Sequence, residues 1–187
     1  MNGRYPHLML DIETLGVTPD APILSLAAVP FGAGEIAPVA VCFHAVLDLQ
    51  AEYAAGAKAS QSTLEWWARQ SPAARQVLDR ATTFGNPPVQ VAAALSSYIG
   101  THMAAIFSVW GNGASFDPVL VSEMFRRHGV LLPWQYNQVR CHRTLLALHP
   151  HVKKSKPTLA HDALSDAYAQ AQTAAMILAE RSGEVRW

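Results

Sequence analysis

The sequence is poor in cysteine and has no long uninterrupted hydrophobic run. Its 187 residues include only two cysteines, Cys42 and Cys141, which are too few for the disulfide framework of a small secreted protein. No apolar run approaches the roughly 18 residues that a membrane-spanning helix needs, and the first ten residues lack the apolar segment of a secretory signal. We therefore expect no membrane partner and a reducing, cytoplasmic location.

Acidic residues are absent from one long stretch of the second half. Between Glu123 and Asp162 the chain has no Asp or Glu but seven basic residues, namely Arg126, Arg127, Arg140, Arg143, Lys153, Lys154 and Lys156. The formal net charge of the whole chain is zero, which argues against a protein that coats polyanions generally. The basic stretch therefore has two interpretations, an ordinary solvated surface or a phosphate-binding one.

The remaining composition is that of a globular protein, and its patterns predict the fold class. Half of the residues are apolar and 15% are charged, with no repeat or linker, so we expect one domain over residues 1–187. Apolar runs predict five strands, at 7–13, 22–31, 38–47, 104–111 and 136–144. Helical periodicity and helix-start residues predict helices at 62–70, from Pro72, at 87–102, at 116–129 and at 158–183. This order predicts an α/β fold in which helices flank a mixed sheet.

Two acids stand at the end of the first predicted strand, in "LMLDIETLG". Asp11 and Glu13 are two residues apart, so they point to the same face of the strand. Neighbouring carboxylates remain ionised most readily with a cation between them, and paired hard oxygens suit Mg²⁺ or Mn²⁺. Two solvated acids at a strand edge are the simpler alternative, because D-x-E is a common tripeptide.

A second group of candidates follows the fourth predicted strand, in "WGNGASFDPVL". Asp117 opens a helix there, a position that Asp favours for purely structural reasons. Asn112 either binds substrate or takes a turn conformation, and Phe116 either stacks on a base or packs in the core. The ends of strands in such sheets are where sites collect, so the functional interpretation of this turn remains open beside the structural one.

The third group is "HDALSDA" near the end of the chain. His161 and Asp166 are five residues apart, so on one continuous helix they would not share a face. They converge only if His161 lies on the loop before the helix and Asp166 lies within it. Asp162 then fits the N-cap position of that helix.

Taken in order, these elements resemble the motifs of a known enzyme group. D-x-E, N-x-x-x-F-D and H-x-x-x-x-D are the motif series of the DEDDh 3′–5′ exonucleases, in the ribonuclease H-like superfamily. The stretches "WGNGASFD", "RCHRTL" and "LEWWARQSPAAR" resemble the exonuclease VIII-like, phage-type and ribonuclease AS-like subgroup most. The resemblance covers roughly residues 7–180, and three motifs in the same order make it specific.

The resemblance implies a fold, an activity and a metal site. The implied fold is a ribonuclease H-like mixed sheet of five strands in the order 3-2-1-4-5. The implied activity is metal-dependent hydrolysis from the 3′ end of single-stranded DNA or RNA, which releases nucleoside 5′-monophosphates with the help of two Mg²⁺ or Mn²⁺ ions. The site residues carried over are Asp11, Glu13 and Asp166 for one metal, Asp11 and Asp117 for the second, and His161 as general base.

The same resemblance implies contacts with the substrate. Thr14, Leu15 and Gly16 would meet the 3′-terminal nucleotide, with backbone amides near its 3′-OH and an apolar wedge under its base. The remaining candidates, for the nucleotide and for phosphates further along the strand, are Asn112, Phe116, Arg143, Lys153, Lys154 and Lys156. Many members of the group are homodimers, so a homodimer is a possible assembly.

Two other functions fit part of the sequence. A member of the fold that has lost catalysis would be a nucleic-acid-binding module, although such members normally lack a ligand and this chain has all five residues. His161 and Asp162 also read as the "HD" of an HD-type metal phosphohydrolase, an all-helical class that the predicted strands argue against. Trp67 falls in a helical apolar stripe and is expected in the core, whereas Trp66 is free either to pack or to stack on bases.

Overall fold

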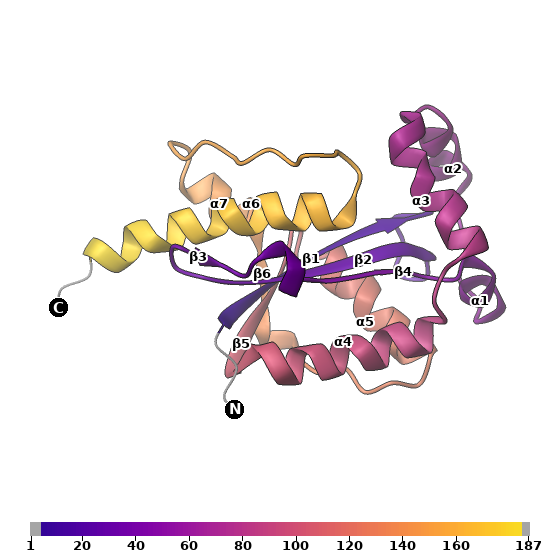
Figure 1. Cartoon of the computed structure of the whole chain (residues 1–187), viewed down its shortest axis with the longest axis horizontal. Coiled ribbons are helices and arrows are strands. Elements are labelled where there is room, and N and C mark those ends of the chain that lie inside the picture. The colour runs from indigo at the N-terminus through magenta and orange to yellow at the C-terminus, as the bar shows by residue number, and fades with distance from the viewer. Residues whose placement is uncertain (1–4, 185–187) are drawn as a thin grey trace.

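The computed structural model describes residues 5–184, and the two ends of the predicted domain, residues 1–4 and 185–187, lie outside this described part. A six-stranded mixed sheet forms its centre (Figure 1). The strands are β1 (Tyr5–Thr14), β2 (Ile23–Gly32), β3 (Glu35–Ile36), β4 (Phe43–Val46), β5 (Met103–Gly111) and β6 (Val139–Cys141).

The central strand is β1, which pairs with β2 on one side and with β5 on the other. The β1–β2 pair is antiparallel, whereas β5 is parallel to both β1 and β6. Parallel strands bring their carboxyl ends to the same edge of a sheet. The acids at the end of β1 therefore lie beside the turn that follows β5.

The sheet has one strand more than we predicted, and the third predicted strand is broken. β3 and β4 both pair with the outer edge of β2, so the main strands β4, β2, β1, β5 and β6 follow the predicted order. Between them the chain forms a short 3₁₀ helix, η1 (Val39–Val41), where a continuous strand over 38–47 was expected. Pro38 precedes this turn, and its carbonyl accepts the Val41 N–H at 2.8 Å instead of a strand partner.

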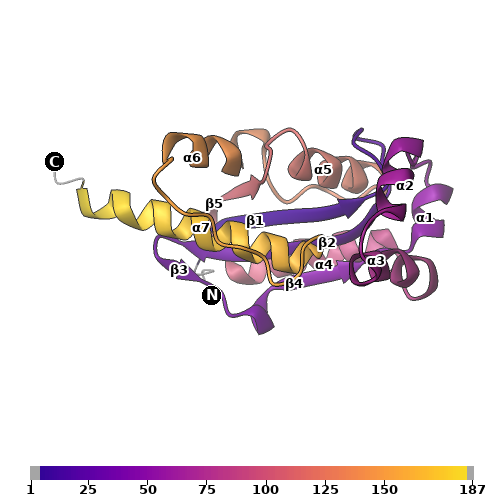
Figure 2. The same cartoon turned by 90° about the horizontal axis from the view of Figure 1, so that it is seen from above.

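Helices cover both faces of the sheet, which confirms the predicted fold class. The long helix α7 lies over β1 and β2 on one face, and α4 and α5 lie on the other (Figures 1 and 2). Their bounds, with those of the remaining helices, are α1 (Leu49–Ala54), α2 (Gln61–Ala68), α3 (Pro72–Thr83), α4 (Pro88–His102), α5 (Asp117–Arg127), η2 (Tyr136–Gln138), α6 (His142–Leu148) and α7 (Ala163–Glu184). The final helix begins five residues later than predicted, because residues 158–162 form turns before it.

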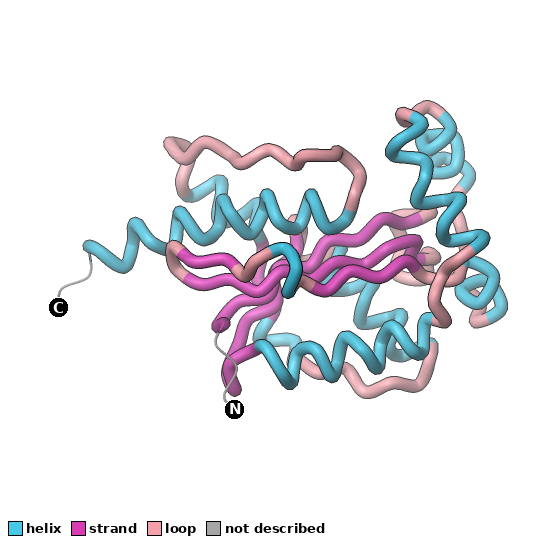
Figure 3. Tube along the Cα trace, viewed as in Figure 1, coloured by secondary structure: helices cyan, strands magenta, loops and turns pink. Residues whose placement is uncertain are grey.

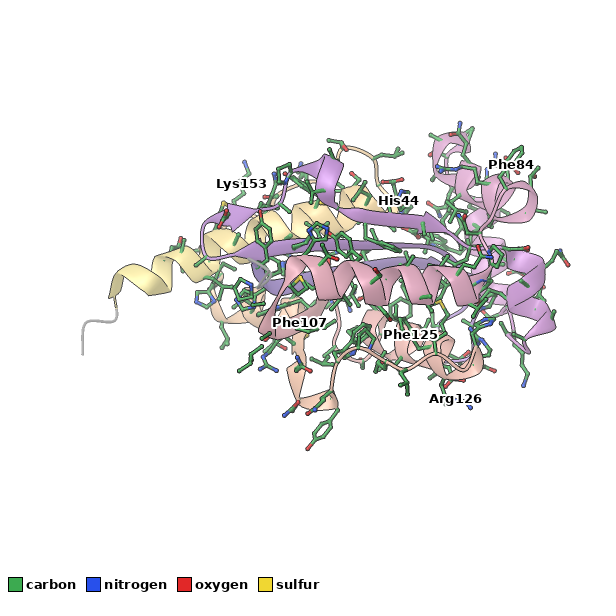
Figure 4. The ribbon with its side chains drawn as sticks, turned by 60° about the horizontal axis from the view of Figure 1, so that its bottom comes forward. His44, Phe84, Phe107, Phe125, Arg126 and Lys153 are labelled. Carbon is green, nitrogen blue, oxygen red and sulfur yellow. The ribbon has the colours of Figure 1, made fainter. Side chains whose placement is uncertain are left out.

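The two faces of β1 contribute to two different cores. Leu8 and Leu10 pack into the core beneath α4 and α5, whereas Met9 packs beneath α7. This is the period of two that a strand imposes on its side chains. The side chains of Phe107 and Phe125 lie in the core between the sheet and the helices α4 and α5, and both are buried (Figure 4). Asp11 and Glu13 continue the alternation on the α7 face.

The helices α1, α2 and α3 gather at one end of the sheet, beyond the carboxyl end of β1 (Figure 3). Their core is a third apolar cluster that includes Leu15, Leu24 and Trp67. None of the helices between residues 5 and 184 combines the length and the apolar character needed to cross a bilayer.

Candidate active site

Two carboxylates lie at the carboxyl end of β1, under the first turns of α7. Asp11 and Glu13 are each 8% exposed, and their partners in β2 are Ala27 and Ser25. A strand buried on both faces fixes where these side chains point, because neither β1 nor its neighbours can shift without disturbing two cores. The two side chains share one face of the strand, as the sequence predicted.

A third carboxylate comes from α7. Asp166 lies in the first turn of this helix, and one oxygen each from Asp11, Glu13 and Asp166 lie within 4.8 Å of one another. The helix can approach the sheet closely because its inner face carries buried alanines, among them Ala163, Ala167 and Ala171. Asp11 and Asp166, which are 155 positions apart in sequence (166 − 11), thus share one cluster.

The fourth carboxylate, Asp117, opens α5 and is 3% exposed. Its Oδ2 atom is buried without a hydrogen-bond partner among the described residues. Gly111, at the end of β5, makes room for it, because a Cβ at that position would lie 2.9 Å from Oδ2 of Asp117. A buried, unpartnered carboxylate oxygen is costly unless a cation or water completes it.

His161 lies on the loop immediately before α7. Its φ is +61°, and its backbone N–H donates to Oδ2 of Asp166 at 2.9 Å. Asp162 caps the helix, since its Oδ1 accepts the Ser165 N–H at 2.9 Å. The loop-plus-helix arrangement therefore brings His161 and Asp166 together in the way that the sequence required.

These residues share one cleft of about 650 Å³. Its lining includes all four acids and the histidine, together with three of the predicted substrate-binding side chains, Asn112, Phe116 and Arg143. A smaller pocket of about 400 Å³ adjoins it across Glu13 and Phe116, and is lined by Thr14 and Gly16 as well as by Trp66 and Trp67 of α2.

Three of the residues expected near the substrate, Leu15, Thr14 and Gly16, pack in the core or hydrogen-bond to each other. The Leu15 side chain is 1% exposed within the third apolar cluster, and it lines neither pocket. It is therefore not available as a wedge under a base in this structure, because the α2–α3 layer covers it. The Thr14 hydroxyl donates to the Gly16 carbonyl at 2.7 Å, so these two residues shape the turn after β1.

The lysines at 153, 154 and 156 lie on the exposed loop between α6 and α7, outside both pockets. Figure 4 shows Lys153 pointing away from the body of the molecule. Arg143, by contrast, opens toward the cleft from the start of α6, where its backbone N–H donates to the Asn112 carbonyl at 3.1 Å. The basic stretch thus contributes one side chain to the cleft and leaves the lysines on the surface.

One residue of the site was missing from the sequence prediction. Gln170 lies one turn after Asp166 on α7, lines the cleft, and donates from Nε2 to Oδ1 of Asp11 at 2.7 Å. Its Oε1 atom is buried without a partner among residues 5–184. The i+4 spacing from Asp166 was a usable signal, because residues four apart lie on the same face of a helix.

The electrostatics of the cluster fit a bound cation. Burial raises the pKa of Asp11 well above its ordinary value, and the nearby Asp117, Glu13 and Asp166 raise it further. Burial, with Asp166 as the largest charge contribution, raises the pKa of Glu13 to about 8. Burial likewise raises the pKa of Asp117 to about 6. The four acids therefore resist being ionised together unless a cation offsets their charge. Their oxygens, including the unpartnered Oδ2 of Asp117, are the hard donors that divalent ions such as Mg²⁺ require.

The fold is shared with solved nucleases. The chain is similar to E. coli exonuclease I in complex with a dT13 oligonucleotide, with a TM-score of 0.68 and 17% identity over 96% of this chain and 42% of that one. It is similar to the nuclease domain of 3′hExo, a DEDDh family member bound to rAMP, with a TM-score of 0.58 and 13% identity over 100% and 98% of the two chains. It is also similar to the Mg²⁺- and Mn²⁺-bound form of S. pombe Pop2p, with a TM-score of 0.58 and 14% identity over 93% of this chain and 83% of that one.

The chain spans about two fifths of the length of the exonuclease I chains that it matches. Comparison of the sequence with curated proteins finds no match. At identities below one fifth, the structural likeness establishes the fold.

The sheet and its covering helices are the fold of these solved nucleases, and the carboxylate cluster lies at the carboxyl end of the central strand. Residues 6–178 match the family model of the 3′-5′ exoribonuclease Rv2179c-like domain. The chain therefore belongs to this family. The all-helical phosphohydrolase considered from the "HD" pair is excluded by the sheet.

Proposed function

We propose that this protein is a 3′–5′ exonuclease that removes nucleotides one at a time from the 3′ end of single-stranded nucleic acid, RNA in the first place, and releases nucleoside 5′-monophosphates. The observation that carries the proposal is the convergence of four carboxylates and one histidine in a single cleft. The preference for RNA follows the description of the family, which is one of exoribonucleases. The exonuclease I structures contain DNA oligonucleotides, so DNA belongs in the test.

Asp11, Glu13, Asp117 and Asp166 would hold two divalent cations, Mg²⁺ or Mn²⁺. Asp11 lies centrally, since the charges of Glu13, Asp117 and Asp166 all act on it, and it would be shared between the two ions. When bound, such ions polarise the phosphate and activate water as a nucleophile. The protein supplies the rigid donor set, because the donors sit on β1 and on the first turns of two helices.

His161 would be the general base. Its ring lines the cleft that the carboxylates share, and imidazole is the side chain best matched to proton transfer near neutral pH. Its backbone N–H donates to Asp166, a candidate metal ligand. This hydrogen bond would keep the positions of His161 and Asp166 fixed relative to each other as substrate enters.

The rest of the cleft offers contacts that do not depend on the base sequence. Phe116 borders both pockets and presents an apolar ring to a terminal base. Arg143 offers a guanidinium to a phosphate, and Asn112 offers an amide beside it. Contacts to phosphates and stacking on base faces tolerate any sequence, which suits an enzyme that degrades from an end.

The test is a substrate panel with purified protein. Single-stranded RNA and DNA oligomers, labelled at the 5′ end, are incubated with Mg²⁺ or Mn²⁺, and the products are sized. We expect shortening in single-nucleotide steps from the 3′ end, release of nucleoside 5′-monophosphates, and no reaction with EDTA. Asp11→Asn and His161→Ala should each lower the rate by at least about 100-fold while circular dichroism stays unchanged.

An inactive nucleic-acid-binding module of the same fold is the remaining alternative. It predicts binding of the oligomers without turnover in any divalent metal. Intact substrate under every metal condition, together with measurable binding, would overturn the proposed function in favour of this alternative.

A further inference from the structure

The ring of His161 has few polar contacts to hold it. The hydrogen bond to Asp166 is made by the backbone N–H, so it fixes the loop and leaves the imidazole free to turn about its own side-chain bonds. Within residues 5–184 no hydrogen bond or ion pair reaches the ring. The positive φ of this residue, +61°, is a conformation that side-chain-bearing residues adopt rarely. A general base in such a position needs a neighbour that orients it.

Two tryptophans of α2 supply the contacts that the ring lacks. The ring centroids of Trp66 and His161 lie 4.8 Å apart, with the planes at 87°. Trp67 lies further off, at 6.4 Å and 74°. An edge-to-face arrangement at these distances is a favoured geometry for aromatic pairs. Trp66 is therefore the nearer of the two rings that pack against the imidazole.

The tryptophan pair is itself anchored to the strand that carries the first acids. Trp67 is 2% exposed, and its indole N–H donates to the Thr14 carbonyl at 2.8 Å. Trp66 packs edge-on against Trp67, with centroids 5.1 Å apart and planes at 81°. The end of β1, the two indoles and the imidazole thus form one chain of contacts beside Glu13.

We propose that Trp66 is a positioning residue, whose ring holds the His161 imidazole in the orientation from which it takes a proton from the attacking water. This inference rests on the proposed function, because it assigns Trp66 a part in the same reaction. The helix α2 belongs to the group of helices beyond the end of the sheet (Figure 1), so the site is completed by a segment outside the sheet and its covering helices.

The competing role for Trp66 is to stack on a base. Its side chain is 36% exposed and borders the smaller pocket next to Phe116. The two roles predict different kinetics. A residue that orients the base acts on kcat, whereas a residue that binds substrate equally in ground and transition states acts on KM.

The first experiment compares Trp66→Leu and Trp66→Phe on a single-stranded RNA oligomer. We expect kcat to fall about tenfold in Trp66→Leu with KM within about twofold, because one misoriented group can cost this much. Trp66→Phe keeps an aromatic ring and should retain at least about one third of kcat. A rise in KM with unchanged kcat would assign Trp66 to base stacking and overturn the inference. Leu64→Ala is the matched control, since Leu64 lies on α2 and is 40% exposed, without a ring contact to His161.

The second experiment asks whether Trp66 acts through His161. In a His161→Ala background, Trp66→Leu should cause no further loss, since the group that it orients is gone. A further loss of the same size as in the wild-type background would show an independent role and overturn the inference.

The third experiment does not depend on turnover. The imidazole protons of His161, assigned by comparison with His161→Ala, should shift in the NMR spectrum of Trp66→Leu and stay near their wild-type positions in Leu64→Ala, because ring currents report the contact directly. If the wild-type protein is active but the His161 imidazole signals do not shift in Trp66→Leu, the result overturns this inference and leaves the proposed function standing. A wild-type protein that cuts no substrate overturns the proposed function, and this inference with it.

Discussion

Gln170 and Asp11, on α7 and β1, are joined by a 2.7 Å hydrogen bond in which the amide Nε2 donates to the carboxylate Oδ1. The contact opposes the repulsion that Asp11 experiences from the other acids, and it lowers the pKa that burial raises. It also fixes the rotamer of Asp11, the residue that we place between the two cations.

Replacing Gln170 by Leu should weaken both metal binding and turnover. A hydrogen bond to a charged group contributes about 1.5–3 kcal/mol, so we expect kcat to fall by at least about tenfold. Isothermal titration with Mn²⁺ should show weaker binding in the same variant. Gln172→Leu, two residues further along α7, is the control and should match the wild type. Unchanged Mn²⁺ affinity in Gln170→Leu would contradict this role of the amide.

The buried ion pair between Glu52 and Arg127 should dominate the stability of the end of the molecule that carries α1. The Glu52 side chain is fully buried, and its Oε2 accepts from Nη2 of Arg127 at 2.7 Å. Without Arg127, Glu52 keeps the His128 ring, whose Nε2 lies 3.3 Å from Oε1, but it loses the guanidinium at 2.7 Å, which leaves the buried carboxylate poorly compensated. We expect Arg127→Ala to lower the free energy of unfolding by about 3–5 kcal/mol in urea denaturation.

The adjacent arginine provides the control for that experiment. Arg126 pairs with Glu123 at 2.6 Å on an exposed face, where its side chain is 74% accessible. Figure 4 shows Arg126 at the surface of α5. Exposed pairs contribute little, so Arg126→Ala should leave the urea midpoint within error. Equal destabilisation by the two substitutions would show that burial is not the deciding factor.

His142 should make stability fall in mild acid. Burial, with a smaller contribution from Lys154, lowers the pKa of His142 to about 4, against about 6.5 in an unfolded chain. Between these values the unfolded state binds more protons than the folded state, so acidification from pH 6.5 to pH 4 favours unfolding. The loss should reach at most about 3 kcal/mol.

The measurement is the difference in unfolding free energy between wild type and His142→Leu at several pH values. Neither ring nitrogen of His142 has a hydrogen-bond partner among the described residues, so leucine should be tolerated at pH 7.5. The raised pKa values of the buried acids act in the opposite direction in both proteins and cancel in the difference. Parallel curves from pH 7.5 to pH 4 would contradict the prediction.

Gly111 should tolerate no side chain. A Cβ there would lie 2.6 Å from Cδ of Pro118 and 2.9 Å from Oδ2 of Asp117, so Gly111→Ala must displace the start of α5. We expect at least about a tenfold loss of activity, because small misplacements of site groups are costly. Gly100→Ala is the contrast, since a Cβ in that part of α4 meets nothing within 4 Å. It should raise stability by about 0.5–1 kcal/mol and leave the rate unchanged.

Local patterns were sufficient for most of the elements and for the order of the acids, although the strand expected over 136–144 is limited to β6 and gives way to α6 at His142. The alternation around Asp11 and Glu13 placed both on one face, and the Asp162 cap placed His161 outside α7. Local patterns were insufficient where distant contacts decide. Gln170 belongs to the site only because α7 crosses β1, and Leu15 is unavailable only because α2 and α3 cover it.

Two local signals were also outweighed or overlooked. The apolar residues of 38–47 favoured a strand, but Pro38 and a 3₁₀ turn interrupt it. The helix α1 was missed, although Asp48 caps it by accepting the N–H groups of Gln50 and Ala51. Six residues give a helix too little periodicity to be recognised, so the cap was the only usable sign.

The carboxylates come from the first strand, from the helix after β5 and from the last helix, and this has a consequence for how activity arises during folding. A folding chain in which α7 has not yet docked on β1 lacks both Asp166 and the loop that carries His161. A sub-fragment that folds around β1, β2 and β5 without α7 cannot contain the complete site. The site is therefore complete only once α7 has docked on β1, and a form of the chain in which this helix is undocked lacks one carboxylate and the histidine.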